Sequence, residues 1–199
     1  MKARGPYCVA TPFAAKIVLR EAMTKLTLTL SALAALLTSA PAFAAAPQPI
    51  KPVPPQLYSG RWYEIARTKN MMQGDCQAGT SDFSALAANG SFSVTQTCRQ
   101  GSPAGPKQVI SASGHVLPQS GFAKMKLGML GGLVTQEYWI VDHADNNAWA
   151  IMDRSDGRYV WLLSRQPVLT AADQAAALSR MRQLGFDMTR VVLSQQPPR

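Results

Sequence analysis

The stretch Gly60-Arg61-Trp62-Tyr63-Glu64-Ile65-Ala66-Arg67 decides the fold of this chain. It follows a proline-rich segment and has the pattern of a β-strand. A second strand-like stretch, Tyr159-Val160-Trp161-Leu162-Leu163-Ser164-Arg165, comes about a hundred residues later and ends in an arginine. An indole is large enough to close one end of a small barrel, and a guanidinium group on its face gains about 0.5–2 kcal/mol. A contact between Trp62 and Arg165 would therefore be favourable if the fold brings the two stretches together.

Short strand patterns recur between these two stretches at regular spacing, which favours an all-β barrel or sandwich. Clusters of Gly, Pro, Asn and Asp separate the patterns and predict turns. The clearest turn is Asn89-Gly90, because both positions tolerate a positive φ. The eight expected strands cover residues 61–68, 78–86, 91–99, 107–116, 123–127, 135–142, 148–153 and 159–165.

The pattern changes after residue 169. Thr170 is a good N-cap, and residues 171–184 are rich in strong helix formers. Apolar residues at a spacing of three predict one buried stripe, and Gly185 is a plausible residue to end the helix. Residues 189–194 are expected to form a last short strand. The stripe consists of Ala175, Leu178, Met181 and Leu184.

Together these features resemble the lipocalin family, in particular the bacterial outer-membrane lipocalin and apolipoprotein D-like branch. The resemblance rests on Trp62 to Arg67, on Trp161 to Pro167 and on Gly185-Phe186-Asp187, and it covers about residues 57–195. It implies an eight-stranded antiparallel up-and-down β-barrel with one C-terminal α-helix and a short final strand. It also implies that Gly60, Trp62 and Arg165 close one end of the barrel and that the other end is open.

Residues in a strand alternate between the two faces of the sheet, so an inward Trp62 places Glu64 and Ala66 inside as well. Glu64 would then anchor a polar ligand head or pair with an internal Arg, Tyr or water. The other candidates either contact a ligand or simply fill the barrel. The full set of expected ligand-binding residues is Trp161, Tyr138, Phe83, Phe92, Val94, Met125, Glu64 and Tyr159.

Two loops with apolar side chains are expected near the open end. Met71 and Met72 either form a pliable lid over the mouth or pack on its rim. Residues 128–133 (Gly-Met-Leu-Gly-Gly-Leu) are a candidate contact for a membrane or a partner if they are exposed.

Cys76 and Cys98 flank the hairpin around Asn89-Gly90, and they predict either one disulfide or two separate thiols. A regular hairpin would leave the two cysteines out of register, so a disulfide requires a β-bulge or a bend near Gly79. No other Cys or His lies close in sequence to complete a metal site, and no metal or cofactor is expected.

Residues 1–44 resemble an N-terminal extension and a secretory signal, with Met23 as the expected start and cleavage after Ala44. An uncleaved anchor is the alternative. Residues 45–56 form a proline-rich lead that should be extended, and residues 57–199 form the lipocalin domain. No Cys between residues 32 and 56 offers an acylation site, so we expect a soluble periplasmic or secreted protein, with association with the outer membrane as the alternative.

The formal net charge is +9, but no run of five or more Lys and Arg indicates a nucleic-acid partner. Enzymatic motifs are missing, and we expect no catalytic residues. The resemblance implies binding, storage or transport of a fatty acid or lysophospholipid in the cell envelope, and residues 128–133 add a candidate peripheral contact with a membrane. The alternatives are an isomerase-type enzyme on the same fold, using Glu64 or Tyr138, and an envelope interaction protein with a filled barrel.

Overall fold

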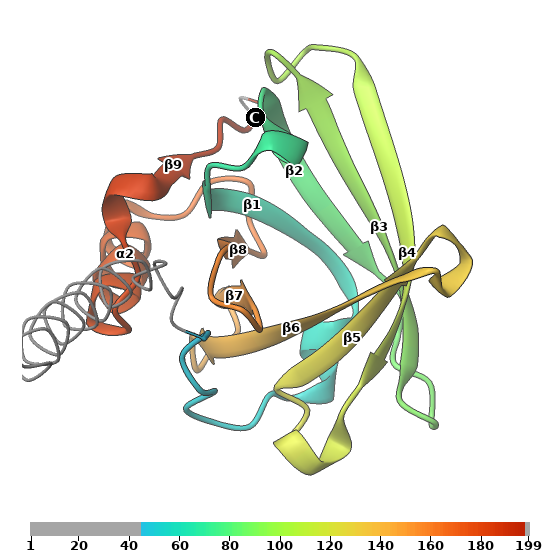
Figure 1. The fold of residues 1–199 in the computed structure, drawn as a ribbon. Helices are drawn as coiled ribbons and strands as arrows, with labels where there is room; N and C mark the ends of the chain where they lie inside the picture. The colour runs from blue at the N-terminus through green and yellow to red at the C-terminus, as the bar shows by residue number, and fades with distance from the viewer. Residues whose placement is uncertain (1–44, 198–199) are drawn as a thin grey trace, which may run out of the picture. The chain divides into compact units, whose positions relative to one another are not determined.

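The computed structural model describes residues 45–197, apart from the side chain of Met72 (Figure 1). The expected signal segment, including Met23 and the cleavage site after Ala44, lies outside the described residues. Nine strands and one α-helix make up the regular structure of the described part: β1 (Gly60–Thr68), β2 (Cys76–Phe83), β3 (Ser91–Gln100), β4 (Lys107–Val116), β5 (Lys124–Met129), β6 (Val134–His143), β7 (Trp149–Arg154), β8 (Val160–Ser164), α2 (Ala171–Gln183) and β9 (Val191–Leu193).

Strands β1 to β8 form a closed antiparallel barrel in which each strand pairs with its neighbours in sequence, and β1 pairs with both β2 and β8. The expected fold is confirmed, and β4 has the predicted bounds. The ninth strand, β9, pairs with the second half of β1 outside this ring. In Figure 1, β9 and α2 lie on the same side of the barrel.

The up-and-down order places alternate loops at opposite ends of the barrel. Residues 69–75, 101–106, 130–133 and 155–159 connect strands at one end, which we call the mouth. At the other end, a 3-10 turn, η1 (Pro55–Tyr58), contributes Leu57 and Tyr58 to the core. The Trp62 indole N–H donates to the carbonyl oxygen of Leu57 at 3.0 Å, so this turn is held against the start of β1.

Apolar side chains form two separate clusters, because each strand contributes to both faces of the barrel wall. The inner cluster includes Trp62, Phe92 and Met125. The outer cluster lies between the barrel and α2, and it includes Ile151, Leu162 and Met181. The helix is therefore packed on the outside of the barrel and leaves the mouth uncovered.

A β-bulge in β1 changes the direction of its second half. The register against β8 shifts between Glu64 and Ala66, so that Glu64 pairs with Leu163 and Ala66 pairs with Leu162. Ile65 and Ala66 consequently both belong to the outer cluster. The expectation that Ala66 faces the lumen is wrong, because an extra residue in a strand reverses the alternation beyond it. The residue that turns inward there is Arg67.

The helix begins as expected, since the Thr170 side chain accepts a hydrogen bond from the Asp173 amide. Its buried residues are Ala177 and Met181, whereas Ala175 is exposed. The predicted stripe is wrong at Ala175, because a spacing of three drifts off one face of a helix that has 3.6 residues per turn. Gly185 follows the helix with a φ of +86°, as expected of a residue that ends a helix.

The proline-rich lead is bonded along the outside of the barrel. Backbone amides of Ala46, Ile50 and Val53 donate to carbonyl oxygens of Ser155, Val141 and Gly121. The lead has no helix or strand and bends at Lys51, and the turn η1 begins at Pro55, inside the segment that was expected to be extended to residue 56. Within residues 45–197, no helix has both the length and the apolar character that crossing a membrane requires.

Candidate functional site

Trp62 and Arg165 close one end of the barrel. The Arg165 guanidinium lies 3.8 Å from the centre of the Trp62 ring, which confirms the expected contact. The same guanidinium donates to carbonyl oxygens of Ser59 and Arg61 at 2.7 and 3.1 Å, so it ties η1 to β1. Gly60 has a φ of +74°, and a Cβ at this position would lie 3.6 Å from the Arg165 side chain.

Four of the expected ligand-binding residues form the floor of the barrel above this closure. Phe83, Phe92, Val94 and Met125 all pack in the inner cluster with Trp62. The Phe83 and Phe92 rings are 5.7 Å apart. The enclosed space left among Trp62, Phe83 and Met125 has a volume of about 10 Å³, which is enough for a single water molecule. The floor is therefore filled by its own side chains.

The three remaining aromatic candidates lie nearer the mouth. Trp161 pairs across the strands with Met152, which belongs to the inner cluster, so its ring faces inward. Its ring centre is 5.9 Å from that of Tyr138 and 6.3 Å from that of Tyr159. All three are only partly buried. Burial raises the pKa of the Tyr138 phenol, so this hydroxyl stays protonated well above neutral pH.

The wall formed by β3 and β4 leaves inward-facing side chains accessible to solvent. Trp62 pairs with Ser81, Ser81 with Gln96, and Gln96 with Ile110, and directly paired residues share a face of the sheet. Gln96 and Ile110 therefore face the lumen, yet Gln96 is exposed and Ile110 is 41% exposed. Above the filled floor, the barrel is open to solvent on this side.

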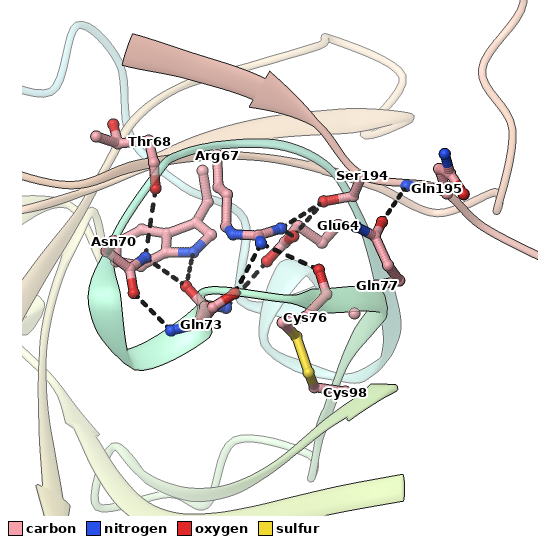
Figure 2. A network of polar contacts seen from close by, with 12 residues as sticks. Glu64, Arg67, Thr68, Asn70, Gln73, Cys76, Gln77, Cys98, Ser194 and Gln195 are labelled. Atoms are coloured by element: carbon pink, nitrogen blue, oxygen red, sulfur yellow. Dashed lines mark hydrogen bonds and ion pairs between the residues drawn. A yellow bond between two sulfur atoms is a disulfide. The ribbon is translucent and has the colours of Figure 1, made fainter. Parts of the chain in front are cut away.

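Glu64 lies in a polar network at the mouth, shown in Figure 2. Arg67 donates through Nη1 to the Glu64 carboxylate at 2.6 Å, and both side chains are almost fully buried. The carboxylate also accepts a hydrogen bond from the Ser194 hydroxyl, next to β9. Of the two alternatives for Glu64, pairing with an internal arginine is the one present in the structure.

A 3-10 turn in the loop between β1 and β2, η2 (Met71–Gln73), completes this network (Figure 2). The Gln73 carbonyl oxygen accepts from Arg67 Nη2 at 2.9 Å, and its side-chain oxygen accepts from the Trp161 indole N–H at 3.1 Å. Its side-chain nitrogen donates to Glu64 at 3.2 Å. Met71 in the same turn is fully exposed, and the side chain of Met72 lies outside the described part.

Sequence reasoning missed Arg67, Gln73 and Ser194 as lumen residues. Arg67 was hidden by the bulge at Ile65, because strict alternation assigns it to the outer face. Gln73 lies in a loop without a periodic pattern, and Ser194 ends a short expected strand whose residues were not assigned to a face. The only available signal was Glu64, since a carboxylate expected inside a barrel requires a compensating donor.

The two cysteines form a disulfide next to this network, with their Cα atoms 5.5 Å apart. The register between β2 and β3 shifts between Gln77 and Thr80, and Ala78 has a φ of +49°. This is the bulge near Gly79 that the sequence required. The carbonyl oxygen of Cys76 accepts from Arg67 Nη2 at 3.0 Å, so the disulfide and the polar network share a strand end.

A larger hollow of about 610 Å³ lies outside the barrel, between the lead, the β6–β7 hairpin and α2. Three of its charged groups are already paired, because Asp142 accepts from Arg180 at 2.6 Å and lies 3.7 Å from Lys51. The hollow is wide open, and we do not assign it as the site. Among residues 45–197, no group of three or more His, Cys, Asp or Glu side chains is placed to hold a metal ion.

Comparison with known proteins agrees with this architecture. A family model described as a lipocalin-like domain matches residues 55–196. Outer membrane lipoprotein Blc of Vibrio cholerae serotype O1 is 22% identical over 153 residues, which span 75% of this chain and 88% of that protein. Insecticyanin from the tobacco hornworm Manduca sexta has a similar fold, with a TM-score of 0.62 at 16% identity over 79% of this chain and 88% of its own. For lobster apocrustacyanin A1 the TM-score is 0.55 at 17% identity, over 72% and 79% of the two chains.

Proposed function

Because the chain belongs to the lipocalin family, whose members bind small hydrophobic ligands, we propose that it binds and carries a single-chain amphiphile, a fatty acid or a lysophospholipid, in the cell envelope. One observation carries this proposal. Inward-facing Ile110 and Gln96 are accessible to solvent above a filled floor, and the rings of Tyr138 and Trp161, which contact each other, are only partly buried.

The proposed site uses the upper lumen, from the floor to the mouth. An acyl chain there would cover apolar surface that water now reaches, and each 100 Å² of it contributes about 2.5 kcal/mol. The polar head would lie near the network of Glu64 and Arg67, where hydrogen-bonding groups are concentrated. Binding of this kind needs no covalent step.

The proposal is tested by two substitutions of neighbouring residues that face opposite sides of β4. Ile110→Asp places a carboxylate in the lumen, whereas Val109→Asp places the same group on the outer face. Val109 is 50% exposed and Ile110 is 41% exposed, so a carboxylate at either position reaches water and neither change should unfold the barrel. We expect Ile110→Asp to weaken binding of palmitate and of palmitoyl lysophospholipid at least about tenfold, and Val109→Asp to change it less than about twofold.

Titration against intrinsic tryptophan fluorescence measures both affinities, and native mass spectrometry of protein purified from cells identifies any lipid that is retained. Equal loss in the two variants, or binding of neither lipid by the unmodified protein, would contradict the carrier function. Turnover of an added lipid that is lost in Glu64→Gln would instead favour an enzyme on this fold.

We also propose that the protein resides in the periplasm or is secreted, since disulfides persist in oxidising compartments. The mouth carries the peripheral membrane contact. In the loop between β5 and β6, Leu130 and Leu133 are 75% and 88% exposed. Lys69 and Lys107 are exposed at the same end and would favour anionic headgroups.

Co-sedimentation with vesicles of anionic phospholipid tests this contact. The double change Leu130→Ser and Leu133→Ser should reduce the bound fraction severalfold, because two large apolar side chains no longer enter the interface. Val168→Ser changes an exposed apolar residue beyond the closed end and is the matched control. Equal binding of all three proteins would rule out this loop as the contact.

A further inference from the structure

The proline-rich lead is attached to the closed end of the barrel through His143, the last residue of β6. We infer that His143 is a pH-sensitive latch, which holds the lead fully only when both nitrogens of its ring are protonated. The latch consists of the His143 ring and the two carbonyl oxygens that it contacts. It lies at the closed end and does not depend on what the lumen binds.

The imidazole ring of His143 lies between two carbonyl oxygens. Its Nδ1 atom is 2.9 Å from the carbonyl oxygen of Ala144, which follows β6. Its Nε2 atom is 3.1 Å from the carbonyl oxygen of Pro52 in the lead. His143 is 6% exposed, so water does not readily replace either contact. One buried ring thus joins the lead to a strand that lies 91 residues further along the chain.

The two contacts of this ring need two ring protons. A carbonyl oxygen only accepts hydrogen bonds, and a neutral imidazole has a single N–H group. In the neutral ring, one nitrogen therefore directs a lone pair at a carbonyl oxygen, and that hydrogen bond is lost. The doubly protonated ring donates to both oxygens. Histidine side chains gain and lose this second proton between about pH 5 and pH 8, so the attachment of the lead should follow pH.

The charged groups around the ring accommodate a cation. Asp142 is 5% exposed, and its carboxylate accepts from the backbone amide of His143 at 2.8 Å, so a buried negative charge lies next to the ring. With a neutral ring, the charged groups that line the outer hollow sum to one negative charge, and with a protonated ring they balance. From the lead, β6, the β6–β7 hairpin and α2, these groups are Lys51, Asp142, Asp145, Asp173 and Arg180.

The lead carries apolar side chains that fill the closed end of the barrel. Directly after Pro52, the Val53 amide donates to the Gly121 carbonyl oxygen at 2.9 Å. The Val53 side chain is 2% exposed and belongs to the inner cluster. The turn η1 follows, and its buried side chains belong to the same cluster. Loss of the contact between His143 and Pro52 therefore loosens the segment that closes the barrel.

A second set of contacts holds the lead beside the latch without using the histidine. The Lys51 ammonium donates to the Asp145 carboxylate at 2.6 Å, and the Ile50 amide donates to the Val141 carbonyl oxygen at 3.2 Å. The lead consequently stays docked at residues 50–51 when the His143 ring is neutral. The expected change is a local loosening after residue 51, and its size is that of one hydrogen bond.

Amide hydrogen exchange of the full chain measures how firmly the lead is held. The protection factor of the Val53 amide, divided by that of amides in the buried strand β7, reports local opening of the lead rather than unfolding of the barrel. We expect this relative protection to fall about two- to tenfold from pH 5 to pH 8, because one hydrogen bond is lost.

His143→Gln is the decisive variant, because a side-chain amide donates only through its nitrogen and cannot serve both carbonyl oxygens at either pH. The relative protection of Val53 in this variant should be low and equal at pH 5 and pH 8. His115→Gln is the matched control, since His115 is the other histidine of the chain and is exposed on β4. This control should retain the fall seen in the unmodified protein.

A relative protection of Val53 that is equal at both pH values in the unmodified protein, or that falls as much in His143→Gln, would overturn the latch. If His143→Gln fails to fold, nitrogen NMR of the labelled imidazole in the unmodified protein still decides. The fall at Val53 must then coincide with loss of the second ring proton of His143. A fall in any other pH range would overturn the latch as well.

Discussion

Two buried carboxylates in this barrel have opposite environments. Glu64 accepts hydrogen bonds from Arg67, Gln73 and Ser194, so its charge is compensated inside the lumen. Asp153 is fully buried on the outer face of β7, and neither of its carboxylate oxygens has a hydrogen-bond partner among the described residues. Its paired neighbours are the apolar residues Trp139 and Val160. Burial raises the pKa of Asp153 to about 7, and nearby Arg154 only partly offsets this shift.

The raised pKa of Asp153 predicts how stability depends on pH. Between about pH 4 and pH 7 the folded protein holds a proton that the unfolded chain releases, so the free energy of unfolding falls as pH rises through this range. Asp153→Asn has no charge to bury, and it should be more stable than the unmodified protein at pH 8 by about 2–4 kcal/mol. Urea unfolding at pH 5 and pH 8 measures the difference. If the free energies of unfolding of the two proteins changed with pH in the same way, the raised pKa of Asp153 would be contradicted.

The C-terminal segment after β9 acts as an element of the barrel wall. Strand β1 pairs with β2 only from Gly60 to Tyr63, and its second half pairs with β9. Beyond β9, the Ser194 amide donates to the Ile65 carbonyl oxygen, and the Gln195 carbonyl oxygen accepts from the Ala78 amide. These residues bridge the two strands where they diverge. The segment also supplies the Ser194 hydroxyl to the polar network (Figure 2).

Removal of residues 194–199 should therefore open the wall beside the mouth. The expected loss in unfolding free energy is about 2–3 kcal/mol, from several hydrogen bonds of about 1 kcal/mol each. Hydrogen exchange at the Ala78 amide should accelerate, while exchange in β6 and β7 should change little. Gln195→Ala is the control, because Gln195 bonds through its backbone. Unchanged exchange at Ala78 after truncation would show that the segment is not part of the wall.

At the scale of the whole molecule, the barrel has a closed, filled end and a polar, disulfide-linked mouth. The closed end is held by Trp62, Arg165 and the turn η1. At the mouth, the disulfide joins the start of β2 to β3, and Cys76 also accepts a hydrogen bond from Arg67. The stability of the mouth consequently depends on whether Cys76 and Cys98 are joined as a disulfide.

The double change Cys76→Ser and Cys98→Ser should lower the free energy of unfolding by about 3 kcal/mol, since the bridge spans 22 residues. A reducing agent should lower the stability of the unmodified protein to the same level and leave the variant unchanged. Urea unfolding with and without dithiothreitol measures both. If dithiothreitol lowered the free energy of unfolding of both proteins equally, the loss would not arise from this disulfide.

Local patterns were enough to predict most elements of the fold. Strand alternation, turn residues and helix formers act over a few residues, so they located the eight barrel strands, the N-cap at Thr170 and the short strand β9. The contact between Trp62 and Arg165 was predictable from the resemblance to the lipocalin family, which implies that these residues close the barrel. The family match over residues 55–196 agrees with these predictions.

The sequence by itself determined where the strands and the helix lie, because these follow from short-range periodicity, and its resemblance to the lipocalins indicated the barrel and the residues that close it. Only the tertiary structure decided what faces the lumen at the mouth. The bulge at Ile65 turns Arg67 inward, and Gln73 and Ser194 reach the same network from distant segments. Such a network depends on a one-residue change of register and on contacts across 127 residues of chain, neither of which a local pattern records.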